Sequence, residues 1–313
     1  MSMKLLLTGC FKYSKEQLKE IEELGYEITF MKDETKRLEI DFNEFDAVVC
    51  NGLFLNNDIS LFENIKMVQL TSAGLERFPL EKVDLDKINL CNARGVYSIP
   101  IAEWVILKIL ELYKSSAIFM DNQKNNIWEK RRDLLELNSK SVCIVGAGSI
   151  GTEIAKRLQA FGVYVTGLDI STEKREFFDE MYLIDELHRY INKFDILILT
   201  LPLTECTYGI INKEILEKMK NTSIIVNVSR GEIINENDLI SSLKNKKIAG
   251  AILDVFNKEP LEKESELWNM EGVIITPHNS FVSNRNSERL YKIIFNNLKA
   301  AITEGEFINK VYK

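Results

Sequence analysis

One stretch, residues 142–151 (VCIVGAGSIG), restricts the fold of this chain more than any other part of the sequence. Its apolar start predicts a buried strand, and the G-x-G-x-x-G that overlaps its end predicts a tight turn into a helix. A second apolar run over residues 163–168 predicts another strand, which ends in Asp169. The order of strand, glycine loop, helix, strand and acidic residue is typical of a dinucleotide-binding unit.

Each glycine of the loop has a separate expected role. Gly146 permits the tight turn, Gly148 lets the backbone approach a phosphate closely, and Gly151 lets the helix pack tightly on the strand. The pyrophosphate of a dinucleotide would then lie at the N-terminus of the helix, where backbone N–H groups point at it. A glycine-rich turn without a ligand is the alternative that the loop alone leaves open.

The acidic residue indicates which dinucleotide binds. Asp169 lies about 20 residues beyond the loop, where a carboxylate accepts hydrogen bonds from the adenosine ribose hydroxyls. The same carboxylate repels the additional phosphate of NADP, so the sequence favours NAD. Lys174 and Arg175 follow closely, and because basic groups accommodate a 2′-phosphate they keep NADP open as the alternative.

Composition limits the classes of protein that this chain can be. Its 313 residues are enough for two domains, and 45% hydrophobic with 28% charged residues is typical of a soluble globular protein. The net charge of −7 offers no basic field for nucleic acid or an anionic membrane. The most apolar stretch, residues 99–112, is interrupted by charged residues, and residues 1–7 are too short for a secretory signal. The five cysteines include no C-x-x-C pair, so we expect neither disulfides nor a metal site, but buried thiols in a cytoplasmic protein.

The first hundred residues alternate strand-like and helix-like pieces. Ser14 begins a predicted helix and Gly25 ends it. Five short apolar runs predict strands, at residues 4–8, 26–30, 47–50, 67–71 and 88–91. Because parallel sheets arise from this alternation, we predict a small flavodoxin-like domain.

A long apolar helix is predicted next, over residues 98–120. Apolar residues cover much of its circumference, which indicates burial at an interface between domains or between subunits. The nucleotide-binding unit follows, with further strands predicted at residues 196–200, 224–227, 249–253 and 273–276, and helices at 212–219 and 236–243. With the first two strands this makes six, the number of a dinucleotide-binding sheet.

The last helix, roughly residues 283–304, comes after that sheet is complete. We therefore expect it to return to the first domain, which makes that domain discontinuous. The predicted fold is α/β with two doubly wound parallel-sheet domains. Residues 1–98 and 284–313 form the flavodoxin-like substrate domain, and residues 99–283 form an inserted Rossmann NAD-binding domain.

Three predicted strand ends carry residues suited to chemistry. His278 directly follows the sixth strand, at the sheet edge where ligands bind in open α/β folds. Arg230 follows another strand, and an arginine there can clamp a carboxylate with two parallel hydrogen bonds. Asp254 ends a third strand with Glu259 five residues on, and a carboxylate beside the imidazole would stabilise its protonated form. The only other histidine, His188, lies in a polar segment and is expected at the surface.

These motifs together resemble the D-isomer-specific 2-hydroxyacid dehydrogenase family, whose members include enzymes of the phosphoglycerate dehydrogenase and hydroxypyruvate reductase type. The resemblance covers nearly the whole chain. Besides the glycine loop and Asp169, the segments that carry it are residues 71–74 (TSAG), 92–95 (NARG), 101–104 (IAEW), 201–204 (LPLT), 227–231 (NVSRG), 254–261 (DVFNKEPL) and 276–278 (TPH).

The resemblance implies a role for each matching residue. Arg230 would hold the carboxylate and carbonyl oxygen of the substrate, His278 would protonate that oxygen, and Glu259 would keep the imidazole basic. Backbone N–H groups of Ser72, Ala73 and Gly74 would bind the carboxylate from the other domain. The implied cofactor contacts are Ser149 and Ile150 at the pyrophosphate, Asp254 at the nicotinamide amide, and Leu201, Pro202 and Val228 along the cofactor cleft. The family's subunits pair through the nucleotide domain, which implies a homodimer.

Two segments depart from the family pattern. Residues 279–281 (NSF) replace an apolar residue followed by small ones, which bears on the acid that fits. Ser139 replaces the usual glycine before the first nucleotide strand, and we expect only a local change in that turn.

The sequence therefore predicts an NAD-dependent oxidoreductase that interconverts a small D-2-hydroxy acid and its 2-keto acid, with hinge closure between the domains. Phosphoglycerate, glycerate with hydroxypyruvate, and D-lactate with pyruvate are all compatible substrates. Arg77 and Arg94 are candidates for binding a substrate phosphate. The alternative is an NAD(H)-binding regulatory protein of corepressor type, and oxidation of formate or phosphite is a further one.

Overall fold

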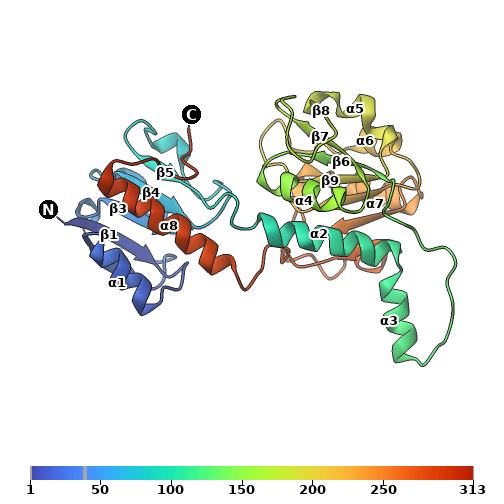
Figure 1. The fold of residues 1–313 in the computed structure, drawn as a ribbon, viewed down its shortest axis with the longest axis horizontal. Helices are drawn as coiled ribbons and strands as arrows, with labels where there is room; N and C mark the ends of the chain where they lie inside the picture. The colour runs from blue at the N-terminus through green and yellow to red at the C-terminus, as the bar shows by residue number, and fades with distance from the viewer. Residues whose placement is uncertain (1, 38–40, 313) are drawn as a thin grey trace. The chain divides into compact units, whose positions relative to one another are not determined.

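The computed structural model describes residues 2–37 and 41–312 of the chain (Figure 1). The chain forms two compact units. Unit 1 comprises Met1–Tyr97 and Ser283–Lys313, and unit 2 comprises Ser98–Val282. Each unit is built around an open sheet of parallel strands, which confirms the predicted fold class.

The sheet of unit 1 has the strand order β2-β1-β3-β4-β5 among the described residues. All its pairings are parallel, and this order is the flavodoxin-like one, whose switch point lies between β1 and β3. The strands are β1 (Met3–Thr8), β2 (Tyr26–Met31), β3 (Ala47–Cys50), β4 (Met67–Leu70) and β5 (Asn89–Cys91).

Two helices cover one face of this sheet, α1 (Lys15–Glu23) and α8 (Asn286–Thr303). Ser14 caps α1 in a capping box with Gln17, and Gly25 follows the helix with φ 106°, as the sequence predicts. The last helix of the chain thus packs on the first sheet through apolar side chains. The other face is covered by loops and short 3-10 helices: η1 (Phe42–Glu44), η2 (Leu53–Leu55), η3 (Ile59–Leu61) and η4 (Leu80–Lys82).

The sheet of unit 2 has seven parallel strands in the order β12-β11-β10-β9-β6-β7-β8. This is the dinucleotide-binding order with one additional edge strand on the β12 side. The strands are β6 (Ser141–Val145), β7 (Tyr164–Asp169), β8 (Glu180–Leu183), β9 (Ile196–Leu199), β10 (Ile224–Asn227), β11 (Gly250–Leu253) and β12 (Val273–Ile275). The predicted number of six strands is wrong, because the sequence analysis missed β8. This strand lies at the edge opposite β12, its ends are exposed, and it lacks the apolar run of a buried strand.

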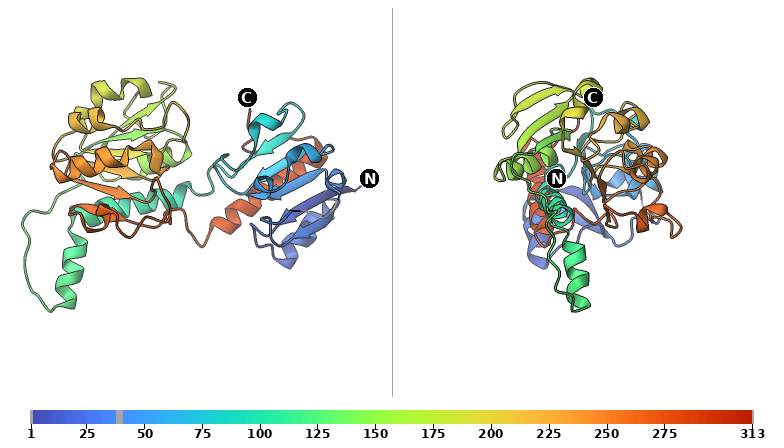
Figure 2. Two further views of the ribbon diagram at one scale, coloured as in Figure 1. Left: turned by 180° about the vertical axis from the view of Figure 1, so that it is seen from behind. Right: turned by 90° about the vertical axis from the view of Figure 1, so that its right-hand side faces the viewer.

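The helices of unit 2 include one clear departure from the sequence prediction. The single helix expected over residues 98–120 is two helices, because Ser115 adopts a left-handed φ of 51° at a pair of serines, which favour helices weakly. The second of them projects from the body of unit 2 (Figures 1 and 2). The helices are α2 (Ser98–Tyr113), α3 (Ser116–Lys124), α4 (Ser149–Gln159), α5 (Leu187–Tyr190), α6 (Lys213–Lys218) and α7 (Glu236–Lys244), and the 3-10 helices are η5 (Ile184–Glu186), η6 (Ile191–Lys193), η7 (Gly231–Ile233) and η8 (Glu266–Asn269).

Ser139 has φ 61°, a left-handed conformation that glycine adopts without strain. Its backbone N–H donates to the Gly162 carbonyl at 2.9 Å, and β6 begins directly after this turn. Ser139 thus takes, within the turn before β6, a conformation that glycine adopts without strain, and the purely local effect of this departure from the family pattern stays a prediction.

The five cysteines are all free thiols. Cys50, Cys91 and Cys143 are buried, Cys10 is half-buried and Cys206 is exposed. Burial raises the pKa of the Cys10 thiol to about 11, although hydrogen bonds from Thr8 and Thr71 oppose the rise. Within the described residues, no helix has both the length and the apolar character needed to cross a membrane.

Candidate active site

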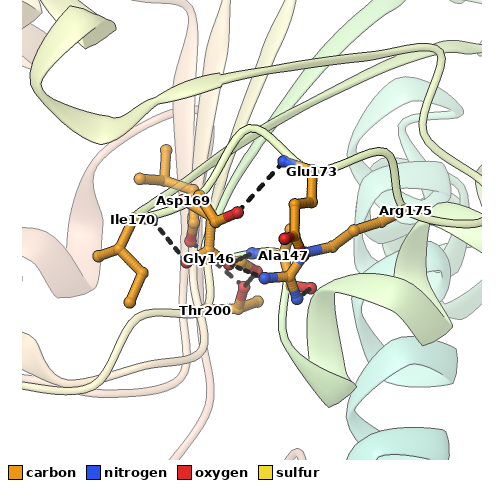
Figure 3. Close-up of polar contacts among 9 residues, drawn as sticks. Gly146, Ala147, Asp169, Ile170, Glu173, Arg175 and Thr200 are labelled. Atoms are coloured by element: carbon orange, nitrogen blue, oxygen red, sulfur yellow. Dashed lines mark hydrogen bonds and ion pairs between the residues drawn. The ribbon is translucent and has the colours of Figure 1, made fainter.

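The glycine loop between β6 and α4 packs as the sequence predicts. Gly146 has φ 100°, and a Cβ there would lie 2.9 Å from the Thr200 carbonyl carbon. A Cβ on Gly151 would lie 2.2 Å from the Gly146 carbonyl oxygen, so only glycine fits at this crossing of helix and strand. Thr200 directly follows β9, the strand that pairs with β6. Its hydroxyl donates to the same Gly146 oxygen at 2.6 Å and so fixes the turn (Figure 3).

The N-terminus of α4 has the form that an anion requires. Gly148 is its N-cap and makes no side-chain capping bond, so the first N–H groups of the helix are available for a phosphate. A Cβ on Gly148 would meet no heavy atom within 4 Å, which means that the backbone faces open space. Ser149 and Ile150 begin the helix there. These residues fit the pyrophosphate of a dinucleotide.

Asp169, at the end of β7, lies directly beside this loop (Figure 3). One carboxylate oxygen accepts from the Ala147 N–H at 2.9 Å and the other from the Ile170 N–H at 2.7 Å. The side chain is 17% exposed, which leaves it accessible to a ribose hydroxyl.

Arg175 contacts the same two residues. Its guanidinium donates to the Ala147 carbonyl at 2.6 Å and lies 3.5 Å from the Asp169 carboxylate. The turn beside the glycine loop therefore contains both an acidic and a basic side chain, held in one cluster (Figure 3).

His278 and Glu259 form a hydrogen-bonded pair at the same carboxyl edge of the sheet, beyond strands β11 and β12. Nδ1 of the imidazole lies 2.8 Å from Oε2 of the carboxylate, whose second oxygen accepts from the Phe256 N–H at 3.1 Å. The two side chains are 41% and 38% exposed, so a small molecule can reach them. An imidazole held by a carboxylate through one nitrogen can exchange a proton through the other.

Asp254 holds the loop that carries His278. Its side chain is fully buried, and its two oxygens accept from the Thr276 hydroxyl at 2.5 Å, the Asn279 N–H at 2.9 Å and the Ser280 N–H at 3.0 Å. The His278 N–H donates to the Asp254 carbonyl at 2.8 Å. A buried carboxylate with three donors fixes the backbone on both sides of the imidazole.

Arg230 lies on a turn that Asn227 builds at the end of β10. The Asn227 amide donates to the Arg230 carbonyl at 2.9 Å and accepts from the Ser229 N–H at 3.0 Å. Gly231 lets this turn approach the next loop, because a Cβ there would lie 2.0 Å from the Phe256 carbonyl carbon. Since β10, β11 and β12 are neighbours, the structure brings the turns that carry Arg230, Glu259 and His278 to the same sheet edge.

The remaining predicted residues lie on two loops of unit 2 and one of unit 1. Leu201 and Val228 are buried and Pro202 is exposed, after β9 and β10. The backbone of residues 72–74 follows β4 in unit 1, where the Ser72 hydroxyl donates to the Gly74 carbonyl at 2.9 Å. His188 is exposed on α5, as predicted.

Three contributors to the site escaped the sequence analysis: Thr200, Asn227 and the clamping role of Asp254. An asparagine at a strand end is a recognisable signal for a turn, and Asn227 could have been found by it. Thr200 and Asp254 act over 54 and 22 or more residues of sequence, and no local pattern reports such contacts.

A nucleotide-binding glycine loop and a His–Glu pair on one sheet edge define the class of nicotinamide-dependent dehydrogenases. The family model of the D-isomer specific 2-hydroxyacid dehydrogenase NAD binding domain matches residues 106–280, and the chain belongs to this family. It is thus an NAD(P)-dependent enzyme of the 2-hydroxyacid dehydrogenase class.

Three relatives illustrate the similarity. An uncharacterized protein in the proB 3′ region of Corynebacterium melassecola is 37% identical over 78% of this chain and 81% of its own. The human glyoxylate reductase/hydroxypyruvate reductase is 30% identical over 76% of this chain and 74% of its own. The crystal structure of a family protein from Aeromonas salmonicida superposes with a TM-score of 0.86 at 26% identity, over 100% of this chain and 99% of the other.

Proposed function

We propose that this enzyme interconverts a small D-2-hydroxy acid and its 2-keto acid with NAD, and that His278 is its general acid and base. The observation that supports this most strongly is the 2.8 Å contact between His278 and Glu259 at the carboxyl edge of the sheet that also carries the glycine loop. The human relative, whose name gives it glyoxylate and hydroxypyruvate reductase activity, supports the same class of substrate.

When bound, reduced nicotinamide would supply the hydride that reduces the carbonyl carbon of the keto acid. His278 donates a proton from Nε2 to the carbonyl oxygen, and Glu259 holds Nδ1 and stabilises the imidazolium between turnovers. Arg230 binds the substrate carboxylate with its planar fork of donors. In the reverse direction His278 takes the proton back.

The substrate carboxylate also receives backbone donors in this proposal. The N–H groups of Ser72, Ala73 and Gly74, on the loop after β4, would bind it, since successive backbone N–H groups form a nest for anions. Unit 1 then contributes binding, and unit 2 contributes cofactor and proton transfer.

For the cofactor, Gly146, Gly148, Gly151 and the first residues of α4, Ser149 and Ile150, would surround the pyrophosphate. Asp169 would accept from the adenosine ribose hydroxyls and favour NAD over NADP. The remaining cofactor contacts would come from Leu201, Pro202 and Val228. Asp254, whose side chain is fully buried and holds three donors, would instead fix the loop that carries His278.

A panel of 2-keto acids with NADH and with NADPH tests the proposal, followed by absorbance of the reduced nicotinamide. We expect oxidation of NADH with at least one small keto acid and a higher kcat/KM with NADH than with NADPH. Absence of turnover with every keto acid contradicts the enzymatic role and would favour the corepressor alternative. A preference for NADPH contradicts only the role of Asp169.

We further propose that the enzyme is a homodimer, and that the segment of α3 and residues 125–135 is part of its interface. This segment presents large apolar side chains to solvent: Trp128 is 95% exposed, Met120 60% and Ile127 50%. Beside it, α2, α3 and β12 line a groove of about 990 Å³. Apolar area of this kind is typical of subunit contacts.

Light scattering on the purified protein tests the assembly. Wild type is expected at twice the mass of one chain, and Trp128→Glu at the mass of one chain with unchanged secondary structure. Leu61→Glu, which adds the same charge at a 49% exposed leucine of unit 1, is the control and stays dimeric. A monomeric wild type contradicts the assembly.

Because all five thiols are free, we also propose that the enzyme works in the reducing cytoplasm.

A further inference from the structure

The carboxyl edge of the unit 1 sheet contains an anion cradle that the chain itself fills. The Glu34 carboxylate accepts from the Thr8 hydroxyl at 2.8 Å and from the backbone N–H groups of Asn51 and Gly52 at 3.0 and 2.7 Å. Two backbone donors and a hydroxyl around one carboxylate are the set of groups with which proteins bind anionic ligands. Here those donors are engaged by Glu34.

The position of this cradle in the sheet gives it significance. Thr8 ends β1, whereas Asn51 and Gly52 directly follow β3, the neighbouring strand. The strand order reverses between β1 and β3, and ligands of open α/β sheets bind at such a switch point. Glu34 therefore places a negative charge where this sheet would receive a ligand.

The loop proposed to bind the substrate carboxylate is one strand further on. The Thr71 N–H donates to the Cys50 carbonyl at 2.9 Å, and the Cys10 thiol makes hydrogen bonds with both Thr8 and Thr71. Adjacent strands lie about 4.8 Å apart. An acid bound by residues 72–74 thus lies within about two strand spacings of Glu34. A phosphate on the third carbon of that acid can span this distance.

We propose that Glu34 is a specificity-determining residue that excludes keto acids with a second anionic group, so that the substrate is an unphosphorylated 2-keto acid. This inference rests on the proposed function. A phosphate carries about two negative charges, and a nearby carboxylate whose donors are already used repels it without compensation.

Among the residues that the structure describes, Glu34 forms no ion pair with a basic side chain, and its partners are a hydroxyl and backbone N–H groups. Lys32, Lys36 and Arg37 are exposed on the same loop, whereas Glu34 directs its carboxylate to the strand ends. Arg77 and Arg94, the candidates for binding a substrate phosphate, are exposed too.

Two substrates and two variants test the role of Glu34. The substrates are hydroxypyruvate and 3-phosphohydroxypyruvate, and kcat/KM is measured with NADH for each. Wild type is expected to prefer hydroxypyruvate by about tenfold or more, and Glu34→Gln, which removes the charge at nearly constant shape, raises relative use of the phosphorylated acid about tenfold. Thr8→Val removes one hydrogen bond to the same carboxylate and keeps its charge, so the ratio stays within about twofold of wild type.

A second measurement needs only the wild-type enzyme. Salt screens the repulsion between Glu34 and the phosphate, so added salt should reduce the difference in kcat/KM between the two substrates. A wild-type preference for the phosphorylated acid overturns the inference. Equal changes of the ratio in Glu34→Gln and Thr8→Val also overturn it, since they assign Glu34 a purely structural role. If no keto acid is turned over, including these two, the proposed function itself is contradicted. If both acids are turned over and Glu34→Gln leaves the ratio of their kcat/KM values at the wild-type value, only the role of Glu34 in selecting the substrate is contradicted.

Discussion

The carboxyl edges of the two sheets present different groups to a ligand. In unit 2, three neighbouring turns supply an arginine, a glutamate and a histidine, and the glutamate and histidine side chains are 38% and 41% exposed. In unit 1, the described strand ends offer backbone N–H groups, hydroxyls and a half-buried thiol, with Glu34 joining β1 to β3. Both histidines of the chain, His188 and His278, lie in unit 2.

The comparison shows that two sheets of the same parallel architecture can carry different functional groups at their carboxyl edges. Both sheets are parallel, and both reverse their strand order at a switch point. Only unit 2 has a histidine on an accessible turn, together with a carboxylate that orients its imidazole. We therefore propose that unit 2 carries out proton transfer and that unit 1 selects the acid by shape and charge.

Replacement of His278 tests this division with the largest expected effect. His278→Asn removes the proton donor, so kcat should fall about a thousandfold. Binding of NADH, followed by its fluorescence, should stay within about twofold because the glycine loop is remote from the change. A loss of NADH binding with unchanged kcat would contradict proton transfer by this residue.

Glu259→Gln should have a smaller effect, because the imidazole stays in place and loses only its charged partner. We expect kcat to fall about tenfold to a hundredfold, the range found for groups that orient another side chain. Glu262→Gln, a nearby carboxylate that pairs with Lys258 instead, is the matched control and should keep wild-type kcat. Equal losses in the two variants would remove the special role of Glu259.

Asp169→Asn should change the choice of cofactor. The amide oxygen can still accept from Ala147, but the charge that opposes a 2′-phosphate is gone while Arg175 remains. The ratio of kcat/KM for NADPH to that for NADH should rise about tenfold. Adding Arg175→Ala should reverse most of this rise, and a ratio that stays at the wild-type value would contradict the role of Asp169.

Cys10→Ala tests the unit 1 edge with the smallest expected effect. Burial raises the pKa of this thiol to about 11, so it stays protonated near neutral pH and transfers no proton. kcat between pH 6 and 9, measured with saturating keto acid, should remain within about twofold of wild type. A change in the pH dependence of kcat would assign proton chemistry to unit 1.

The sequence was sufficient for most of this architecture because buried parallel strands are continuous apolar runs. The runs over residues 196–200 and 224–227 predict β9 and β10 almost to the residue. The edge strand β8 and the break at Ser115 were missed, since β8 lacks an apolar run and the break is a single backbone conformation.

The candidate site divides in the same way. The turns of Arg230, Glu259 and His278 were predictable, because parallel strands deliver their carboxyl ends to one edge. The contacts of Glu34 with Thr8 and Asn51 were not predictable. These partners lie 26 and 17 residues from Glu34 in the sequence, and such contacts leave no periodic pattern.

The central claim is that unit 2 carries out hydride transfer to C2 of a 2-keto acid bound with help from unit 1. The most direct measurement uses NADH carrying deuterium at both C4 positions, with hydroxypyruvate as acceptor, and NMR of the product. The account predicts glycerate of D configuration with one deuterium at C2. Glycerate without deuterium at C2, or of L configuration, would contradict it.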